Sequence, residues 1–168
     1  EDGVYVGCGS RNKGGDGQAV ARVLFLAGRN VEIVLVGNRD KMTPQCRKQL
    51  EIVQAYGLSV SDHIKKTVSF SAVVDAVFGV GLSRMVEGCY AELLSEMNSL
   101  GGTKVAVDMP SGISSDTGAV LGTAFRADIT ITFGFEKRGL HLWPGNTYSG
   151  RVVCASIGIT PESFCGRM

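Results

Sequence analysis

The hydrophobic positions of this 168-residue chain form short apolar runs that alternate with stretches of helical spacing. Several runs are apolar throughout rather than alternating, which is typical of parallel strands covered on both faces. The segment Ser59–Ser71 is equally compatible with a short strand and with a loop. Six runs predict β-strands: Val4–Cys8, Val31–Val36, Ala72–Phe78, Lys104–Asp108, Asp128–Phe133 and Arg151–Ile157.

Three stretches between these runs predict helices, namely Gly17–Ala27, Thr43–Tyr56 and Glu87–Leu100. Thr43 and Pro44 form an N-cap followed by a first-turn proline, and a glycine follows each helix. The alternation of strands and helices predicts an α/β fold, with a Rossmann-like, doubly wound, mostly parallel sheet in three αβα layers. We expect residues 1–168 to form one domain, since this length suffices for a single core.

Polar or glycine-rich segments follow four of the predicted strands: Gly7–Gly17, Gly79–Arg84, Asp108–Gly112 and Gly134–Gly139. In doubly wound sheets, ligands bind beyond the carboxyl ends of the strands. We therefore expect these four segments to meet at one edge of the sheet and to form a ligand site there.

The first of these segments favours a phosphate ligand. Val6–Gly17 contains five glycines in twelve residues, and such a turn before a helix presents backbone N–H groups and a helix dipole to an anion. A purely structural tight turn is the alternative. An ordinary dinucleotide-dependent dehydrogenase fits poorly, because the spacing is not GxGxxG and no acidic residue follows the second strand near Val36.

Two aspartates carry the candidate chemistry. Asp108 ends an apolar run, where a partly dehydrated carboxyl group suits acid–base catalysis or simply accepts hydrogen bonds from the following turn. Asp75 lies inside another run and needs a cation or several donors. With the Ser111 hydroxyl and turn carbonyls it would line a site for a hard cation, and a salt bridge is the alternative. Lys137 fits phosphate binding and solvent exposure equally well.

Composition restricts the partners. The net charge is +1 without a basic block, which argues against nucleic acid. No apolar run reaches the ~18–20 residues of a membrane helix. The five cysteines show no CxxC spacing; they indicate reduced thiols in a cytoplasmic protein rather than disulfides or zinc.

Five motifs, in order along the chain, resemble the YjeF N-terminal domain family of NAD(P)H-hydrate epimerases. The resemblance implies an isomerase that interconverts the R and S forms of NADHX and NADPHX, so that NAD(P) is part of the substrate and not a redox cofactor. A catalytically inactive nucleotide-binding or interaction domain of the same fold is the alternative. The motifs are RNKGGDG (Arg11–Gly17), DAVFGVGLSR (Asp75–Arg84), VDMPSGISSDTG (Val107–Gly118), ADITITFGFEKRGL (Ala127–Leu140) and PGNTYSGRVVCASIGI (Pro144–Ile159).

The resemblance also implies roles for individual residues. It makes Asp108 the catalytic acid–base group, and Asp75 and Ser111 ligands of a potassium ion. It further implies that the family's N-terminal helices are missing from this chain, and that a fused ADP-dependent dehydratase domain is a partner in many bacteria; association with a second copy is left open. The implied substrate-binding residues are Asn12, Lys13, Gly14, Gly15, Asp16, Gly79, Val80, Gly81, Leu82, Ser83, Arg84, Met85 and Asp108.

One position departs from the family pattern. Lys13 stands where the family has an asparagine that binds potassium, and an ammonium group has no lone pair to offer a cation. Such a chain either binds potassium with fewer ligands, holds the ammonium in its place, or has lost activity. We predict that the Lys13 ammonium lies near Asp75 and Ser111 and partly replaces the ion. The alternative is a Lys13 side chain in solvent.

Overall fold

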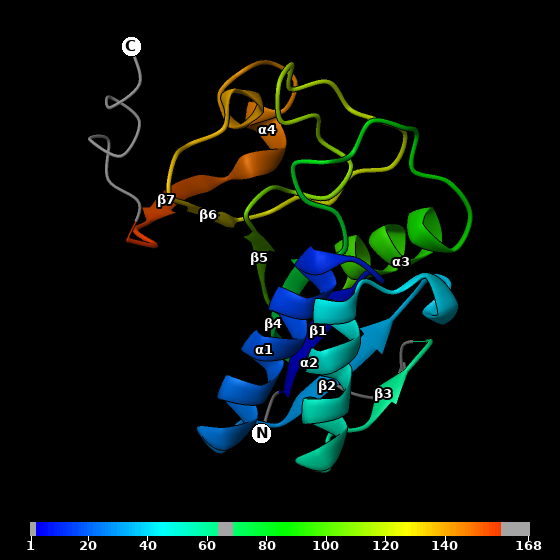
Figure 1. Ribbon diagram of the computed structural model, residues 1–168. Coiled ribbons are helices and arrows are strands. Elements are labelled where there is room, and N and C mark those ends of the chain that lie inside the picture. Colours follow the sequence, from blue (N-terminus) through cyan, green and yellow to red (C-terminus); the bar gives the residue numbers. More distant parts are fainter. Residues whose placement is uncertain (1–2, 64–68, 159–168) are drawn as a thin grey trace.

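A seven-stranded sheet, parallel at every described strand pair, forms the centre of the protein (Figure 1). The computed structural model describes residues 3–63 and 69–158. The strand order β3-β2-β1-β4-β5-β6-β7 reverses between β1 and β4, which is the switch point of a doubly wound sheet. The predicted fold class is therefore confirmed. The strands are β1 (Gly3–Cys8), β2 (Val31–Leu35), β3 (Val60–Ser61), β4 (Phe70–Ala76), β5 (Thr103–Val107), β6 (Ile129–Phe133) and β7 (Arg151–Ala155).

Helices cover both faces of the sheet. α1 (Asn12–Leu26) and α2 (Pro44–Ala55) pack on one face, and α3 (Gly88–Ser99) packs on the other. Alternate residues of β1 explain both contacts, because Val6 joins the core under α1 and α2 while Tyr5 joins the core under α3. A one-turn helix, α4 (Asn146–Ser149), precedes β7. Within the described ranges, every helix is too short or too polar to cross a membrane.

The helix after β1 begins five residues before the predicted Gly17, because α1 starts at Asn12. The glycines allow close packing of its first turns. A Cβ atom on Gly14 would overlap the carbonyl oxygen of Gly9, and one on Gly17 would overlap the Ala76 side chain. Much of the predicted glycine-rich turn is therefore helix, pressed against the sheet and the loop after β1.

The strand boundaries differ from the prediction by up to two residues. β4 ends at Ala76 rather than at Phe78, so Val77 and Phe78 belong to the loop beyond the sheet edge. The ambiguous segment Ser59–Ser71 begins with the short strand β3, and its residues 64–68 lie outside the described residues, as does Cys165. The four described cysteines are free thiols, as predicted.

Candidate functional site

A cavity of about 640 Å³ lies at the carboxyl edge of the sheet, beside the switch point. Its volume falls in the range of small-molecule sites. Residues that follow four strands, and the last residue of a fifth, line it: Arg11, Asn12, Lys13, Asp16, Thr43, Val77, Phe78, Gly79, Val80, Gly81, Leu82, Ser83, Arg84, Asp108 and Phe133. Three of the four predicted loops, those after β1, β4 and β5, therefore meet here, joined by Phe133 at the end of β6 and Thr43 after β2.

Three of the predicted substrate-binding residues do not line this cavity. Gly14 and Gly15 are buried, and a Cβ atom on Gly15 would lie 3.3 Å from the Cα atom of Cys46 in α2. Met85 is 56% exposed outside the lining. These two glycines therefore serve the packing of α1, and the part of the first loop that faces the cavity is Arg11, Asn12, Lys13 and Asp16.

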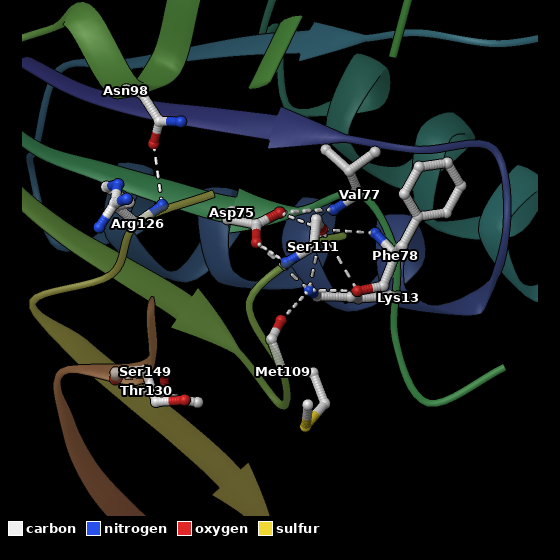
Figure 2. Close-up of polar contacts among 10 residues, drawn as sticks. All are labelled: Lys13, Asp75, Val77, Phe78, Asn98, Met109, Ser111, Arg126, Thr130 and Ser149. Atoms are coloured by element: carbon white, nitrogen blue, oxygen red, sulfur yellow. Dashed lines mark hydrogen bonds and ion pairs between the residues drawn. The ribbon is translucent and has the colours of Figure 1, made fainter. Parts of the chain in front are cut away.

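The Lys13 side chain turns inward from the first turn of α1 and is only 6% exposed. Its Nζ atom donates to the carbonyl oxygens of Phe78, at 2.5 Å, and Met109, at 2.6 Å. It also lies 3.3 Å from Ser111 Oγ and 3.6 Å from Asp75 Oδ2. Figure 2 shows these oxygen atoms converging on the ammonium group. The prediction that the Lys13 ammonium lies near Asp75 and Ser111 is thus confirmed.

Asp75 is fully buried in β4, and its carboxylate accepts three further hydrogen bonds. Its Oδ2 accepts from the Ser111 backbone at 2.7 Å, and its Oδ1 accepts from Ser111 Oγ at 2.6 Å and the Val77 backbone at 3.1 Å. Burial lowers the pKa of Lys13, and the negative charge of Asp75 opposes that change. Asp75 and Ser111 therefore form one hydrogen-bonded unit with Lys13, joining the loops after β4 and β5 to α1.

Asp108 immediately follows β5 and is the only described non-glycine residue with a positive φ, 67°. A left-handed conformation costs a non-glycine residue of the order of 1–3 kcal/mol and is frequent at functional sites. All three of its side-chain hydrogen bonds end on Oδ1: from Thr132 Oγ1 at 3.1 Å, the Phe133 backbone at 3.3 Å and Lys137 Nζ at 2.6 Å. No hydrogen bond or ion pair among the described residues ends on Oδ2, which leaves this oxygen available at the cavity.

Lys137 is a residue whose role the sequence left undecided. Its Nζ atom pairs with Asp108 and also donates to Phe133 O at 2.9 Å and Thr132 Oγ1 at 3.0 Å. The side chain is 21% exposed. Of the two alternatives that the sequence left open for Lys137, solvent exposure does not describe this side chain. The apolar strand β6 and the glycine after it place this lysine within reach of β5, which spacing alone does not reveal.

A family model described as the YjeF-related protein N-terminus matches residues 1–139. The chain belongs to this family. A relative from Limosilactobacillus fermentum, named NAD(P)H-hydrate epimerase, is 41% identical over 90% of this chain and 73% of its own length. A relative of the same name from Levilactobacillus brevis is 42% identical over 94% of this chain and 74% of its own length.

Two further comparisons place the YjeF N-terminal domain in context. A protein from Thermofilum pendens, named a bifunctional NAD(P)H-hydrate repair enzyme, is 40% identical over 89% of this chain but only 30% of its own length. A crystal structure of a yeast protein superposes with a TM-score of 0.75 at 21% identity, over 92% of this chain and 65% of the yeast chain. The yeast structure supports the fold of this YjeF N-terminal domain.

Proposed function

We propose that this protein is an NAD(P)H-hydrate epimerase, an isomerase that interconverts the R and S forms of NADHX and NADPHX. The curated relatives carry this name at about 40% identity over most of the chain. The observation that carries the chemistry is the Asp108 carboxylate. One of its oxygens is held by three donors, and the other is available at a cavity of nucleotide-binding size.

The reaction needs a group that can both give and take a proton. The inverted carbon, C6 of the hydrated ring, carries a hydroxyl group beside the ring nitrogen. Asp108, protonated on Oδ2, gives its proton to this hydroxyl, which leaves as water; the products are a carboxylate and a planar C6=N1⁺ iminium centre. Water then adds to either face of C6, and the proton that it loses returns to the Asp108 carboxylate. Opening of the C6–N1 bond is a second route to a planar carbon. One carboxyl group serves both directions in either route.

Lys137 acts as the positioning residue of this proposal. Its ammonium holds Oδ1 of Asp108 at 2.6 Å, so the second oxygen keeps a constant direction. The Thr132 hydroxyl restrains the same oxygen at 3.1 Å. A base fixed by several partners loses less entropy when the substrate arrives, which favours turnover.

The rest of the cavity suits a dinucleotide. Arg11 and Arg84 are exposed at its lining and supply positive charge for the phosphate groups. The first turn of α1 adds unpaired backbone N–H groups and a dipole that favours an anion. Residues 79–84 line the same cavity and would contact the nicotinamide end of the substrate.

The potassium ion implied by the resemblance does not fit the residues present. The Lys13 ammonium already lies among the oxygen atoms that would bind the ion, at 2.5 Å from Phe78 O and 2.6 Å from Met109 O. A second cation at the same place would meet a like charge in a buried site. No step of the proposed reaction therefore passes through potassium.

The test is an epimerisation assay on the purified protein. Each separated epimer of NADHX is incubated with enzyme, and the R and S forms are resolved by chromatography against an enzyme-free control. We expect Asp108→Asn to lower the rate by ~10²–10⁴-fold, with Asp116→Asn, an exposed aspartate outside the cavity lining, unchanged. A folded wild-type protein that binds NADHX but leaves each epimer unchanged would instead support the inactive nucleotide-binding domain.

A further inference from the structure

A buried ammonium group occupies a cage of oxygen atoms between three segments of this protein. Lys13 reaches from α1 to the carbonyl oxygens of Phe78, after β4, and Met109, after β5. Ser111 Oγ and Asp75 Oδ2 complete the cage at 3.3 Å and 3.6 Å (Figure 2). Four oxygens around one positive charge are the surroundings that a monovalent cation would have.

The contacts match a charged lysine. An ammonium group has three N–H donors. Two of them point to the carbonyl oxygens of Phe78 and Met109, and the third is shared between the neighbouring oxygens of Ser111 and Asp75. A neutral amine would offer only two donors and would turn its lone pair toward an oxygen. The buried carboxylate of Asp75 supplies the compensating negative charge.

The cage also determines the position of the proposed catalytic group. Met109, whose carbonyl oxygen accepts from Lys13, directly follows Asp108 and its left-handed backbone. Met109 is completely buried, so this peptide has little freedom. The positive charge that orders the loop is therefore part of the chain itself and does not depend on an ion from solution.

We propose that Lys13 is a covalently attached replacement for a bound monovalent cation, and that this protein is consequently independent of potassium. Since the chain carries the cation in the same molecule, the cage is filled at any ion concentration. This inference deepens the proposed function, but its first test requires no substrate, so the two proposals fail separately.

Thermal unfolding of the wild-type protein is compared in KCl, NaCl and tetramethylammonium chloride at equal ionic strength. We expect the same melting temperature in all three salts. Anything that binds only the folded state stabilises it by mass action, so an ion at ~100 times its Kd would raise the melting temperature by about 5 °C or more. Such a rise in KCl alone would overturn the proposal.

Lys13→Asn restores the amide that the family has at this position. We expect this variant to become stabilised by potassium over sodium and to bind K⁺ in titration calorimetry. The exposed Lys41→Asn serves as the matched control and should remain unresponsive. A folded Lys13→Asn protein with no potassium response would show that the cage is not a cation site and would overturn the proposal.

A chemical measurement covers the case in which Lys13→Asn does not fold. Native wild-type protein is treated with an amine-acetylating reagent, and modified lysines are located by mass spectrometry. We expect Lys41 to react at least 100-fold faster than Lys13; equal rates would contradict a caged ammonium. In the epimerisation assay, wild-type turnover should be equal in potassium and sodium buffers, whereas Lys13→Asn should be faster in potassium.

Discussion

Replacing Lys13 with methionine is the most direct perturbation of the interactions around Asp75. Methionine keeps the unbranched length of the side chain and removes the charge with its N–H donors. In the wild-type protein the ammonium is 3.6 Å from a carboxylate with no exposed surface. The variant therefore leaves a buried negative charge without its cation, in a protein whose fold is otherwise unchanged.

The expected loss follows from the contacts that remain. Removing one partner of a buried ion pair costs ~3–5 kcal/mol. Asp75 retains three hydrogen-bond donors, two from Ser111 and one from the Val77 backbone. We therefore take the cost of leaving its charge unpaired at the lower limit of this range, ~3 kcal/mol. Two carbonyl oxygens also lose a donor. That of Phe78 is only partly buried and can be hydrated, whereas that of Met109 is buried, so its loss adds ~1–3 kcal/mol, again taken at the lower limit. We expect Lys13→Met to lower the free energy of unfolding by about 4 kcal/mol.

Urea unfolding of a double-mutant cycle measures this value. The cycle contains wild type, Lys13→Met, Asp75→Asn and the double variant, with the exposed Lys41→Met as a control for the substitution itself. Two groups that share one network should show a coupling energy of ~1–3 kcal/mol, so the double variant loses less than the two single losses combined. A loss under about 1 kcal/mol for Lys13→Met, or strict additivity, would refute a buried pair.

Three further outcomes are expected. Lys137→Met should reduce kcat by more than tenfold with a smaller change in KM, because a positive charge that orients Asp108 acts mainly in the chemical step. Lys137→Arg keeps the positive charge and should recover part of the loss. Equal effects on kcat and KM would argue against this role. Gly14→Ala should prevent stable folding, since the added methyl group would overlap a backbone carbonyl oxygen, whereas Gly101→Ala should be nearly neutral in thermal unfolding, as it has open space around it. Partial burial, and to a smaller extent the charge of Asp108, raise the pKa of Asp16. The folded protein therefore holds this proton more tightly than the unfolded chain, and the stability that this gives is lost as the pH rises through the raised pKa. Asp16→Asn should accordingly be more stable than wild type at pH 7, by less than ~1 kcal/mol, and no more stable than wild type near pH 3.

Several features of this protein were predictable from local patterns. Continuous apolar runs between amphipathic stretches indicate a parallel sheet, and the parallel arrangement brings the carboxyl ends of all strands to one edge. That rule is enough to bring Asn12, Gly79 and Asp108 around one cavity, although they are far apart in the chain. The motif at Val107–Gly118, with the other four, indicated the YjeF N-terminal family, which the family model confirms.

Other features depended on contacts between distant segments. The start of α1 at Asn12 and the need for Gly14 follow from how closely the helix meets the loop after β1, and glycine content alone fits a turn equally well. The sequence shows Lys137 as a charged residue in a polar loop. Only the pairing of β5 with β6 brings it to Asp108, 29 positions away.

The amino-acid sequence by itself determined the layers, the edge that carries the site and the residue types available there, because these follow from periodicities of two and 3.6 residues and from strand direction. Only the tertiary structure decided whether Lys13 lies in solvent or in an oxygen cage. Its partners Phe78, Met109 and Ser111 are 65, 96 and 98 positions away. A long, flexible lysine gains these contacts only when the loops after β4 and β5 close around it and Asp75 offsets its loss of water.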